Sequence, residues 1–177
     1  PGDAYELAYA TDPTSAFGSY LYGTSYAVRG VVRYAADGVE TFFASVSGGG
    51  VYGARFGPGG VWGSDFYAMS SSGSIQRFDA NGNRTFLTTG LPVNNKGFDF
   101  GPGGAWGDYV YVGIGGVGII RVAPDGTQSP FLTTFPDLKT DYIVSVAFDT
   151  GGLFGGDLFV STLANKIFRF DSSGNPT

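Results

Sequence analysis

Short runs that alternate apolar and polar residues follow one another along the 177-residue chain, and turn-forming residues separate them. Three such runs are alike in sequence: ETFFAS (Glu40–Ser45), RTFLTT (Arg84–Thr89) and SPFLTT (Ser129–Thr134). Alternation over this length is typical of a β-strand, and no segment shows the 3.6-residue period of an amphipathic helix. Between the runs, Asn81-Gly82 and Asp125-Gly126 supply the positive φ angles that tight hairpins need. The pattern predicts an all-β chain of short antiparallel strands.

The runs belong to a repeat. An aromatic-glycine turn is followed by a strand of β-formers and then by a strand that ends in Arg, an apolar residue, a short loop and Gly. The arginines are spaced by 44, 44 and 48 residues: Arg33, Arg77, Arg121 and Arg169. Trp62, Trp106 and Phe154 each precede their arginine by 15 residues. A constant offset of this kind indicates one structural unit built four times.

Each unit holds four predicted strands. In the third unit they are Gly97–Phe100, Tyr109–Ile114, Gly118–Val122 and Pro130–Thr134. Repetition every 40–50 residues with four strands per unit predicts the blades of a β-propeller, in which neighbouring sheets pack face to face. We expect a single domain over residues 1–177, with blades at about 1–46, 47–93, 94–138 and 139–177. The recurring FGPGGxWG is then the turn between a blade's first and second strands.

The fourth unit stops at Asn175-Pro176-Thr177, where its outer strand would begin. We therefore expect the last blade to lack this strand and to leave a sheet edge unpaired. Three alternatives stay open: the chain is part of a larger propeller, a partner or further copies complete it, or four blades close alone. We favour a chain that is incomplete or completed by a partner.

Composition narrows the function classes. The chain has no histidine and no cysteine, which excludes disulfides, thiolate chemistry, His-based zinc sites and a triad with a histidine base. The net charge is −5 and the ten basic residues are scattered, so nucleic acid is not an expected partner. No apolar run approaches the ~20 residues of a membrane span. From composition we expect an extracellular or periplasmic protein.

Two stretches, GGDLFVSTLANKIFRFDSSG (Gly155–Gly174) and SDFYAMSSSGSIQRFDANG (Ser64–Gly82), resemble the NHL-repeat and gluconolactonase-like propellers. The resemblance covers nearly the whole chain, but its motifs are structural, and they imply a fold rather than an activity. These families usually have six blades, whereas this chain codes for about four. The gluconolactonase-like enzymes hold a divalent metal on the propeller axis, so the resemblance brings in a metal-dependent lactonase as an alternative function.

The first strand of a blade lines the propeller channel, so its polar residues are the candidate ligand-binding set. Alignment on the aromatic-glycine turns places Arg55, Asp99 and Ala147 in register, with Ala8 in the first blade. Loops at the channel entrance add further polar residues. The candidate set is Glu6, Arg55, Asn94, Asn95, Asp99 and Asp141. For Arg55 and Asp99 we favour an ion pair across neighbouring blades, and we predict no catalytic residue.

Other polar and aromatic motifs favour scaffold roles. DANGN (Asp79–Asn83) resembles part of a calcium loop, but position 12 counted from Asp79 is Gly90 rather than a bidentate glutamate, so we interpret it as a hairpin turn. Trp62 and Trp106 are expected to pack between blades rather than to stack on sugars. Each repeated arginine is expected to pair with a carboxylate or carbonyl of the adjacent blade.

The sequence thus predicts a non-catalytic binding or scaffolding propeller, secreted or an accessory subunit, that engages a partner through a loop face or its open edge. A protein partner or self-association would complete the propeller or cover that edge. No cofactor is expected, with calcium kept open. The alternatives are the metal-dependent lactonase and a sugar-binding lectin.

Overall fold

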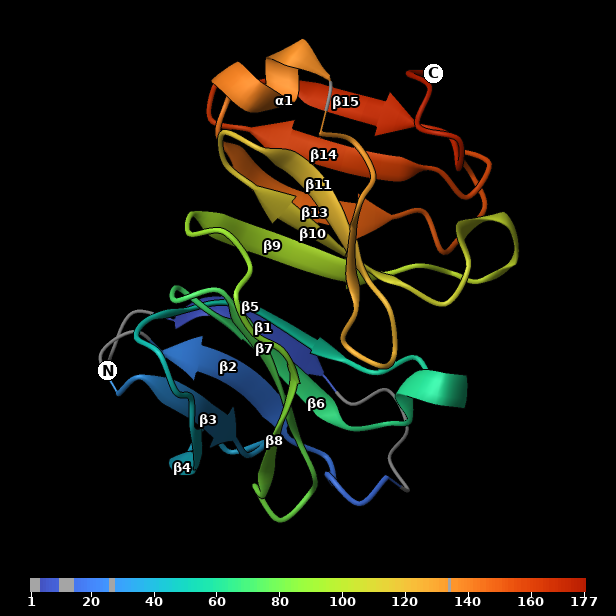
Figure 1. Cartoon of the computed structure of the whole chain (residues 1–177). Coiled ribbons are helices and arrows are strands. Elements are labelled where there is room, and N and C mark those ends of the chain that lie inside the picture. The colour runs from blue at the N-terminus through green and yellow to red at the C-terminus, as the bar shows by residue number, and fades with distance from the viewer. Residues whose placement is uncertain (1–3, 10–14, 26–27, 134) are drawn as a thin grey trace. The chain divides into compact units, whose positions relative to one another are not determined.

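The computed structural model describes residues 4–9, 15–25, 28–133 and 135–177. The chain divides into two compact units, Pro1–Leu91 and Pro92–Thr177, which we describe separately. Nearly all regular structure in the described residues is β-strand (Figure 1). The fold prediction is confirmed: this is an all-β propeller of four antiparallel sheets, two in each unit.

The first unit holds two four-stranded sheets, each a simple meander with its strands in chain order. The strands of the first blade are β1 (Ala4–Tyr9), β2 (Leu21–Ser25), β3 (Gly30–Tyr34) and β4 (Glu40–Ser45). Those of the second blade are β5 (Val51–Phe56), β6 (Phe66–Ser70), β7 (Ser74–Phe78) and β8 (Arg84–Thr88). Apolar side chains of both sheets, among them Tyr22, Phe66 and Phe78, form one core between them.

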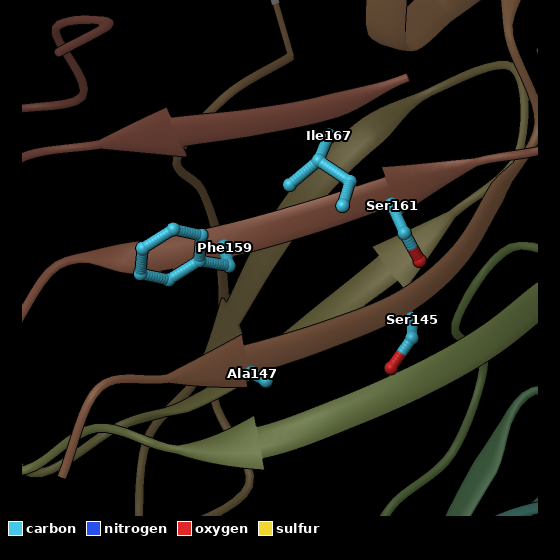
Figure 2. Close-up of a pocket in the computed structure, with 5 residues that line it drawn as sticks. All are labelled: Ser145, Ala147, Phe159, Ser161 and Ile167. Atoms are coloured by element: carbon cyan, nitrogen blue, oxygen red, sulfur yellow. The ribbon is translucent and has the colours of Figure 1, made fainter. Parts of the chain in front are cut away.

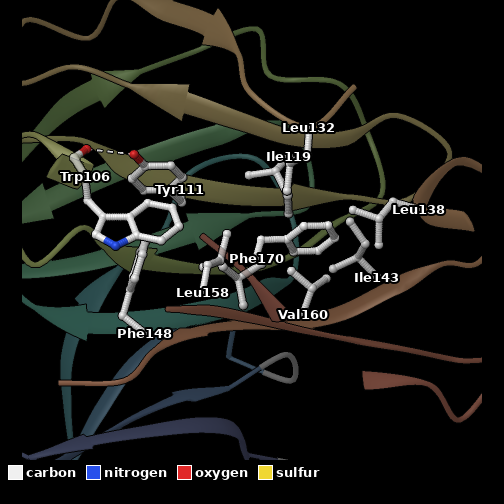
Figure 3. Packing of buried hydrophobic residues seen from close by; sticks show 11 residues of the cluster. Trp106, Tyr111, Ile119, Leu132, Leu138, Ile143, Phe148, Leu158, Val160 and Phe170 are labelled. Atoms are coloured by element: carbon white, nitrogen blue, oxygen red, sulfur yellow. Dashed lines mark hydrogen bonds between the residues drawn. The ribbon is translucent and has the colours of Figure 1, made fainter. Parts of the chain in front are cut away.

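The second unit repeats this plan. The third blade consists of β9 (Asn95–Phe100), β10 (Val110–Ile114), β11 (Gly118–Val122) and β12 (Gln128–Pro130). The fourth blade has three strands, β13 (Ile143–Phe148), β14 (Leu158–Thr162) and β15 (Ile167–Phe170), with one further bridge between Phe170 and Pro176. Figure 3 shows the core between these two sheets, in which Trp106 and Tyr111 lie beside Phe148.

One local prediction for the third unit was wrong. Its outer strand is Gln128–Pro130 rather than Pro130–Thr134, because Pro130 has no N–H with which to continue the ladder and the next two amides, of Phe131 and Leu132, both donate to the Ile119 carbonyl. A short helix, α1 (Pro136–Thr140), then leads into the fourth blade. Pro136 opens it, in the first-turn position where proline's missing N–H costs nothing.

The recurring FGPGGxWG has the predicted role. It forms single 3-10 turns, η1 (Gly60–Trp62) and η2 (Gly104–Trp106), between the first and second strands of blades two and three. The glycine before each turn has φ near +90°, 94° at Gly59 and 81° at Gly103, which a side chain would disfavour. The geometry turns the indole inward, so Trp62 and Trp106 are only 3% and 6% exposed. Both tryptophans are therefore packed rather than exposed, and packing between blades is confirmed for Trp106, which contacts Phe148 of the fourth blade.

Candidate functional site

The predicted alignment of the first strands is confirmed by the strand pairing. Ala8, Arg55, Asp99 and Ala147 each pair with the second residue of the following strand: Tyr22, Tyr67, Tyr111 and Phe159. Each first strand also carries a register shift at its beginning, so the bulge is part of the repeat. Arg55 and Asp99 therefore occupy equivalent positions of equivalent blades, whereas Glu6 lies two positions earlier on the first strand of its blade.

Glu6 and Arg55 are brought together. The Glu6 carboxylate of the first blade forms an ion pair with the Arg55 guanidinium and accepts the Ala54 N–H at 2.9 Å, both in the second blade. This interaction joins neighbouring sheets of the first unit. The ion pair expected between Arg55 and Asp99 would join the two units and stays a prediction.

The remaining candidates lie in the second unit. Asp99 on β9 accepts the Phe148 N–H at 2.9 Å and so links the third blade to the fourth. Asn94 precedes β9 with a positive φ of 72°, and its carbonyl accepts the Gly115 N–H. Asn95 begins β9, but its side chain lies outside the described residues. Asp141 follows α1 and pairs with Lys166 at 3.0 Å.

The described side-chain contacts of Glu6, Arg55, Asp99 and Asp141 are with other parts of the chain. Within the described residues, no group of three or more acidic, cysteine or histidine side chains is placed to hold a metal ion. The Asp79 carboxylate accepts hydrogen bonds from the backbone N–H groups of Asn81 and Asn83 at 2.9 Å each and from the Asn83 side chain. These bonds, with that of the Asn83 side chain as the largest cause, hold the pKa of Asp79 below its ordinary value. The described residues contain no helix long and apolar enough to cross a membrane.

The repeated arginines were expected to pair with the adjacent blade. This prediction was wrong for Arg77 and Arg169, whose carboxylate partners lie in their own blades. Arg77 pairs with Asp65 at 2.5 Å, and Arg169 pairs with Asp157 at 2.7 Å. In blades one and three tyrosines stand at the equivalent position, and the guanidinium lies 4.8 Å from the ring centre of Tyr20 or Tyr109. The residue before the second strand thus anchors the arginine, by charge in even blades and by cation–π contact in odd ones.

A second repeated pair mediates contact between blades. In the first three blades a buried tyrosine on the second strand donates its hydroxyl to the carbonyl of the aromatic residue five positions earlier: Tyr22 to Phe17, Tyr67 to Trp62 and Tyr111 to Trp106. Within each unit, these aromatic pairs face the phenylalanine that ends the next blade's first strand. Phe56 lies 5.1 Å from Phe17 and 5.4 Å from Tyr22, and Phe148 lies 4.8 Å from Trp106 and 5.1 Å from Tyr111.

In the fourth blade the same surface lies open. Its aromatic pair is Phe154 and Phe159, with ring centres 5.4 Å apart. Phe154 is 53% exposed, although Trp62 and Trp106 at this position are buried. Beside the pair is a hollow of about 190 Å³, whose lining side chains project from one face of β13, β14 and β15 (Figure 2). We call this surface the open face: Ser145, Ala147, Phe154, Phe159, Ser161 and Ile167.

The sequence analysis missed the open face, although it predicted an unpaired edge on the same blade. One signal was present: only the fourth blade has phenylalanine, Phe159, where the others have the hydroxyl-bearing tyrosine. The alternation Ser145, Ala147 in one strand and Phe159, Ser161 in the next also places these side chains on one face.

No protein-family model matches the chain, and no curated protein sequence matches it. Solved structures do. Virginiamycin B lyase from Staphylococcus aureus matches 97% of this chain at a TM-score of 0.70 and 17% identity, and a protein of unknown function from Bacteroides caccae matches 99% at 0.66 and 13%. The PQQ-bound aldose sugar dehydrogenase from Streptomyces coelicolor matches 91% at 0.62 and 23%.

These likenesses show the fold alone. The chain is a β-propeller. It spans 53%, 59% and 56% of the length of these three proteins, so their activities do not pass to it. The sequences of the matched structures are too different for residue roles to be carried over.

Proposed function

We propose that the chain is a non-catalytic binding or scaffolding β-propeller, secreted or an accessory subunit of a larger assembly, and that the open face is its binding surface. The observation that carries this proposal is an exposed apolar surface on the fourth blade. The equivalent surfaces of the first and third blades are buried against the next blade of the same unit. Ile167 is 74% exposed and Phe154 53%. Contiguous exposed apolar side chains around a hollow are typical of an interaction site.

The contacts of the candidate channel residues support a binding role over a catalytic one. Glu6 is the natural carboxylate for a metal on the first strands, but its oxygens are taken up by Arg55 and the Ala54 N–H. The NHL or gluconolactonase-like relationship, calcium and an extracytoplasmic location remain part of the proposal. A lectin is disfavoured because Trp62 and Trp106 are buried and present no ring to a sugar.

A peptide selection tests the open face as a binding surface. Peptides displayed on phage and selected on the wild-type protein should include binders that lose at least tenfold in affinity on Ile167→Lys. Val61→Lys is the matched control, because Val61 is an exposed apolar residue that is not part of the open face. Selected binders that ignore Ile167→Lys would count against the proposal. Lactone hydrolysis by the wild type that is lost on addition of a chelator would also count against the proposal, because it would indicate a metal-dependent lactonase.

A further inference from the structure

The first blade carries a surface that matches the open face. Leu7 and Tyr9 project from β1 on the side opposite Glu6 and Ala8, and each is 53% exposed. Ala8 packs against the core shared with the second blade, so the opposite side of β1 is the side that a preceding blade would cover. We call Leu7 and Tyr9 the β1 face.

Strand register shows which residues of the other blades are equivalent to those of the β1 face. Tyr9 ends β1 and pairs with the first residue of the second strand, Leu21. Phe56 and Phe148 end β5 and β13 and pair with Phe66 and Leu158 at the same position. Tyr9 is therefore the counterpart of the two phenylalanines that pack on the aromatic pair of the blade before them.

The open face also offers space for a side chain of the β1 face. In the third blade, Gly97 and Gly113 lie so close to the fourth that a Cβ on Gly113 would stand 2.8 Å from Val146 and one on Gly97 3.2 Å from the Val146 nitrogen. Ser145 and Ser161 occupy these two positions on the open face, and Leu7 is the counterpart of Val146. Both serines carry the Cβ that Gly97 and Gly113 lack, so Leu7 cannot approach them as closely as Val146 approaches the glycines. The 190 Å³ hollow beside the serines is the space that can take the longer leucine side chain.

From these two surfaces we infer that a second copy of this chain occupies the open face. The β1 face of one copy packs on the open face of the other, with Tyr9 against Phe154 and Phe159 and Leu7 against Ser145 and Ser161. Each copy carries one surface of each kind, so two head-to-tail contacts close a dimer. The dimer holds eight blades, within the range of about four to eight that propellers use. This inference rests on the proposed binding role of the open face and names the partner.

Mass measurement tests the contact from both sides. Light scattering and sedimentation over a range of concentrations should give twice the 18.5 kDa chain mass for the wild type. Tyr9→Lys and Phe159→Lys should each weaken self-association at least tenfold, whereas Val61→Lys should not. Circular dichroism and the melting temperature verify that each variant is folded. A wild type that is monomeric at every concentration would overturn the inference.

Mixing the two lysine variants makes the test specific to head-to-tail contact. Tyr9→Lys keeps its open face and Phe159→Lys keeps its β1 face, so the mixture should form a dimer that neither variant forms alone. This outcome also guards against misfolding, because a damaged chain would not restore association. Failure of the mixture to associate, with both variants folded, would contradict the proposed pairing.

Cysteine cross-linking identifies the occupant, because the natural chain has no cysteine. Leu7→Cys mixed with Ser145→Cys should give a disulfide-linked dimer on mild oxidation. A chain that carries both substitutions should not form an intramolecular disulfide at high dilution. Such a disulfide would mean that the first blade contacts the fourth blade of the same chain, and it would refute the inference that a second copy occupies the open face. If the wild type is monomeric and still selects peptides that depend on Ile167, the binding function stands and this inference fails.

Discussion

The Tyr111 hydroxyl donates a 2.7 Å hydrogen bond to the carbonyl oxygen of Trp106, five residues before it in the chain. The bond ties the turn η2 to the second strand of its blade and fixes the indole edge-on to the tyrosine ring, 5.5 Å away. Trp106 then donates its own Nε1–H to the Gly156 carbonyl of the fourth blade at 2.9 Å. Two residues thus connect a blade's turn, its sheet and the next blade.

Removal of the tyrosine hydroxyl should destabilise the fold measurably. Tyr111→Phe leaves the Trp106 carbonyl without this donor in a site where Tyr111 is 1% exposed. The expected loss is about 1–3 kcal/mol of the free energy of unfolding, the cost of an unsatisfied buried group. Urea unfolding at constant slope measures it. Tyr142→Phe, at a half-exposed tyrosine, is the control and should change stability by less than ~0.5 kcal/mol. Equal effects of the two substitutions would show that the hydroxyl does not matter.

Truncation of the indole should cost more. Trp106→Ala removes a large ring that contacts Tyr111, Phe131 and Phe148, and we expect a loss of about 3–5 kcal/mol. Trp106→Phe copies the residue that the first and fourth blades carry at this position and should recover more than half of that loss. Both are measured by denaturant unfolding, with Val61→Ala as an exposed control. A cost for Trp106→Ala near that of Val61→Ala would contradict the interblade role of the indole.

The sequence was sufficient for the fold because the repeat constrains it at every level. The fixed distance from Trp106 to Arg121 and from Trp62 to Arg77 placed them on equivalent turns and strands, and the strand register of all four blades confirms this. The strand ending at Pro130 was misplaced because alternation in SPFLTT continues past the residue at which the regular ladder ends, and beyond it Phe131 and Leu132 both donate to one carbonyl, that of Ile119. Alternation shows which face of a strand each side chain occupies, whereas the end of the strand is determined by the hydrogen bonds that its backbone N–H groups donate.

The candidate site was less predictable. Glu6 and Arg55 could be placed on neighbouring first strands, but their mutual pairing depends on which strand face each occupies. The open face exists because the described residues leave Phe154 and Ile167 exposed. A repeat predicts the same packing for every blade, so it does not identify the blade whose face stays exposed. The arginine partners were misassigned because the repeat shows that Asp65 and Tyr20 occupy one position, but not that this position lies within reach of the arginine of the same blade.

Exchange of one arginine anchor for the other should be tolerated. Asp65→Tyr gives the second blade the residue of the first and third, so Arg77 would lie over a ring rather than against a carboxylate. The Arg77 side chain is about half exposed, and ion pairs near the surface are worth about 0–1 kcal/mol, so we expect little change in stability. The salt dependence of unfolding should decrease, because a cation–π contact is less screened than the pair it replaces. Unfolding in low and high salt measures this, with Asp65→Ala as the variant that has neither anchor. A large loss for Asp65→Tyr alone would show that the two anchors are not equivalent.

Acid should destabilise the protein through its hairpin turns. Hydrogen bonds from the Asn83 and Asn175 side chains, followed by turn N–H groups, hold the pKa values of Asp79 and Asp171 below the ordinary value. A carboxyl group whose pKa is lower in the folded than in the unfolded chain stabilises the fold above the unfolded pKa of about 3.9, and this contribution is lost as the pH falls through the folded pKa. The free energy of unfolding should therefore fall below about pH 5, and the double variant Asp79→Asn/Asp171→Asn should show a shallower fall. Denaturant unfolding at a series of pH values measures the slope. Asp108→Asn, at an exposed aspartate outside these turns, should leave it unchanged. A double variant with the wild-type slope would rule out the turn carboxylates as its source.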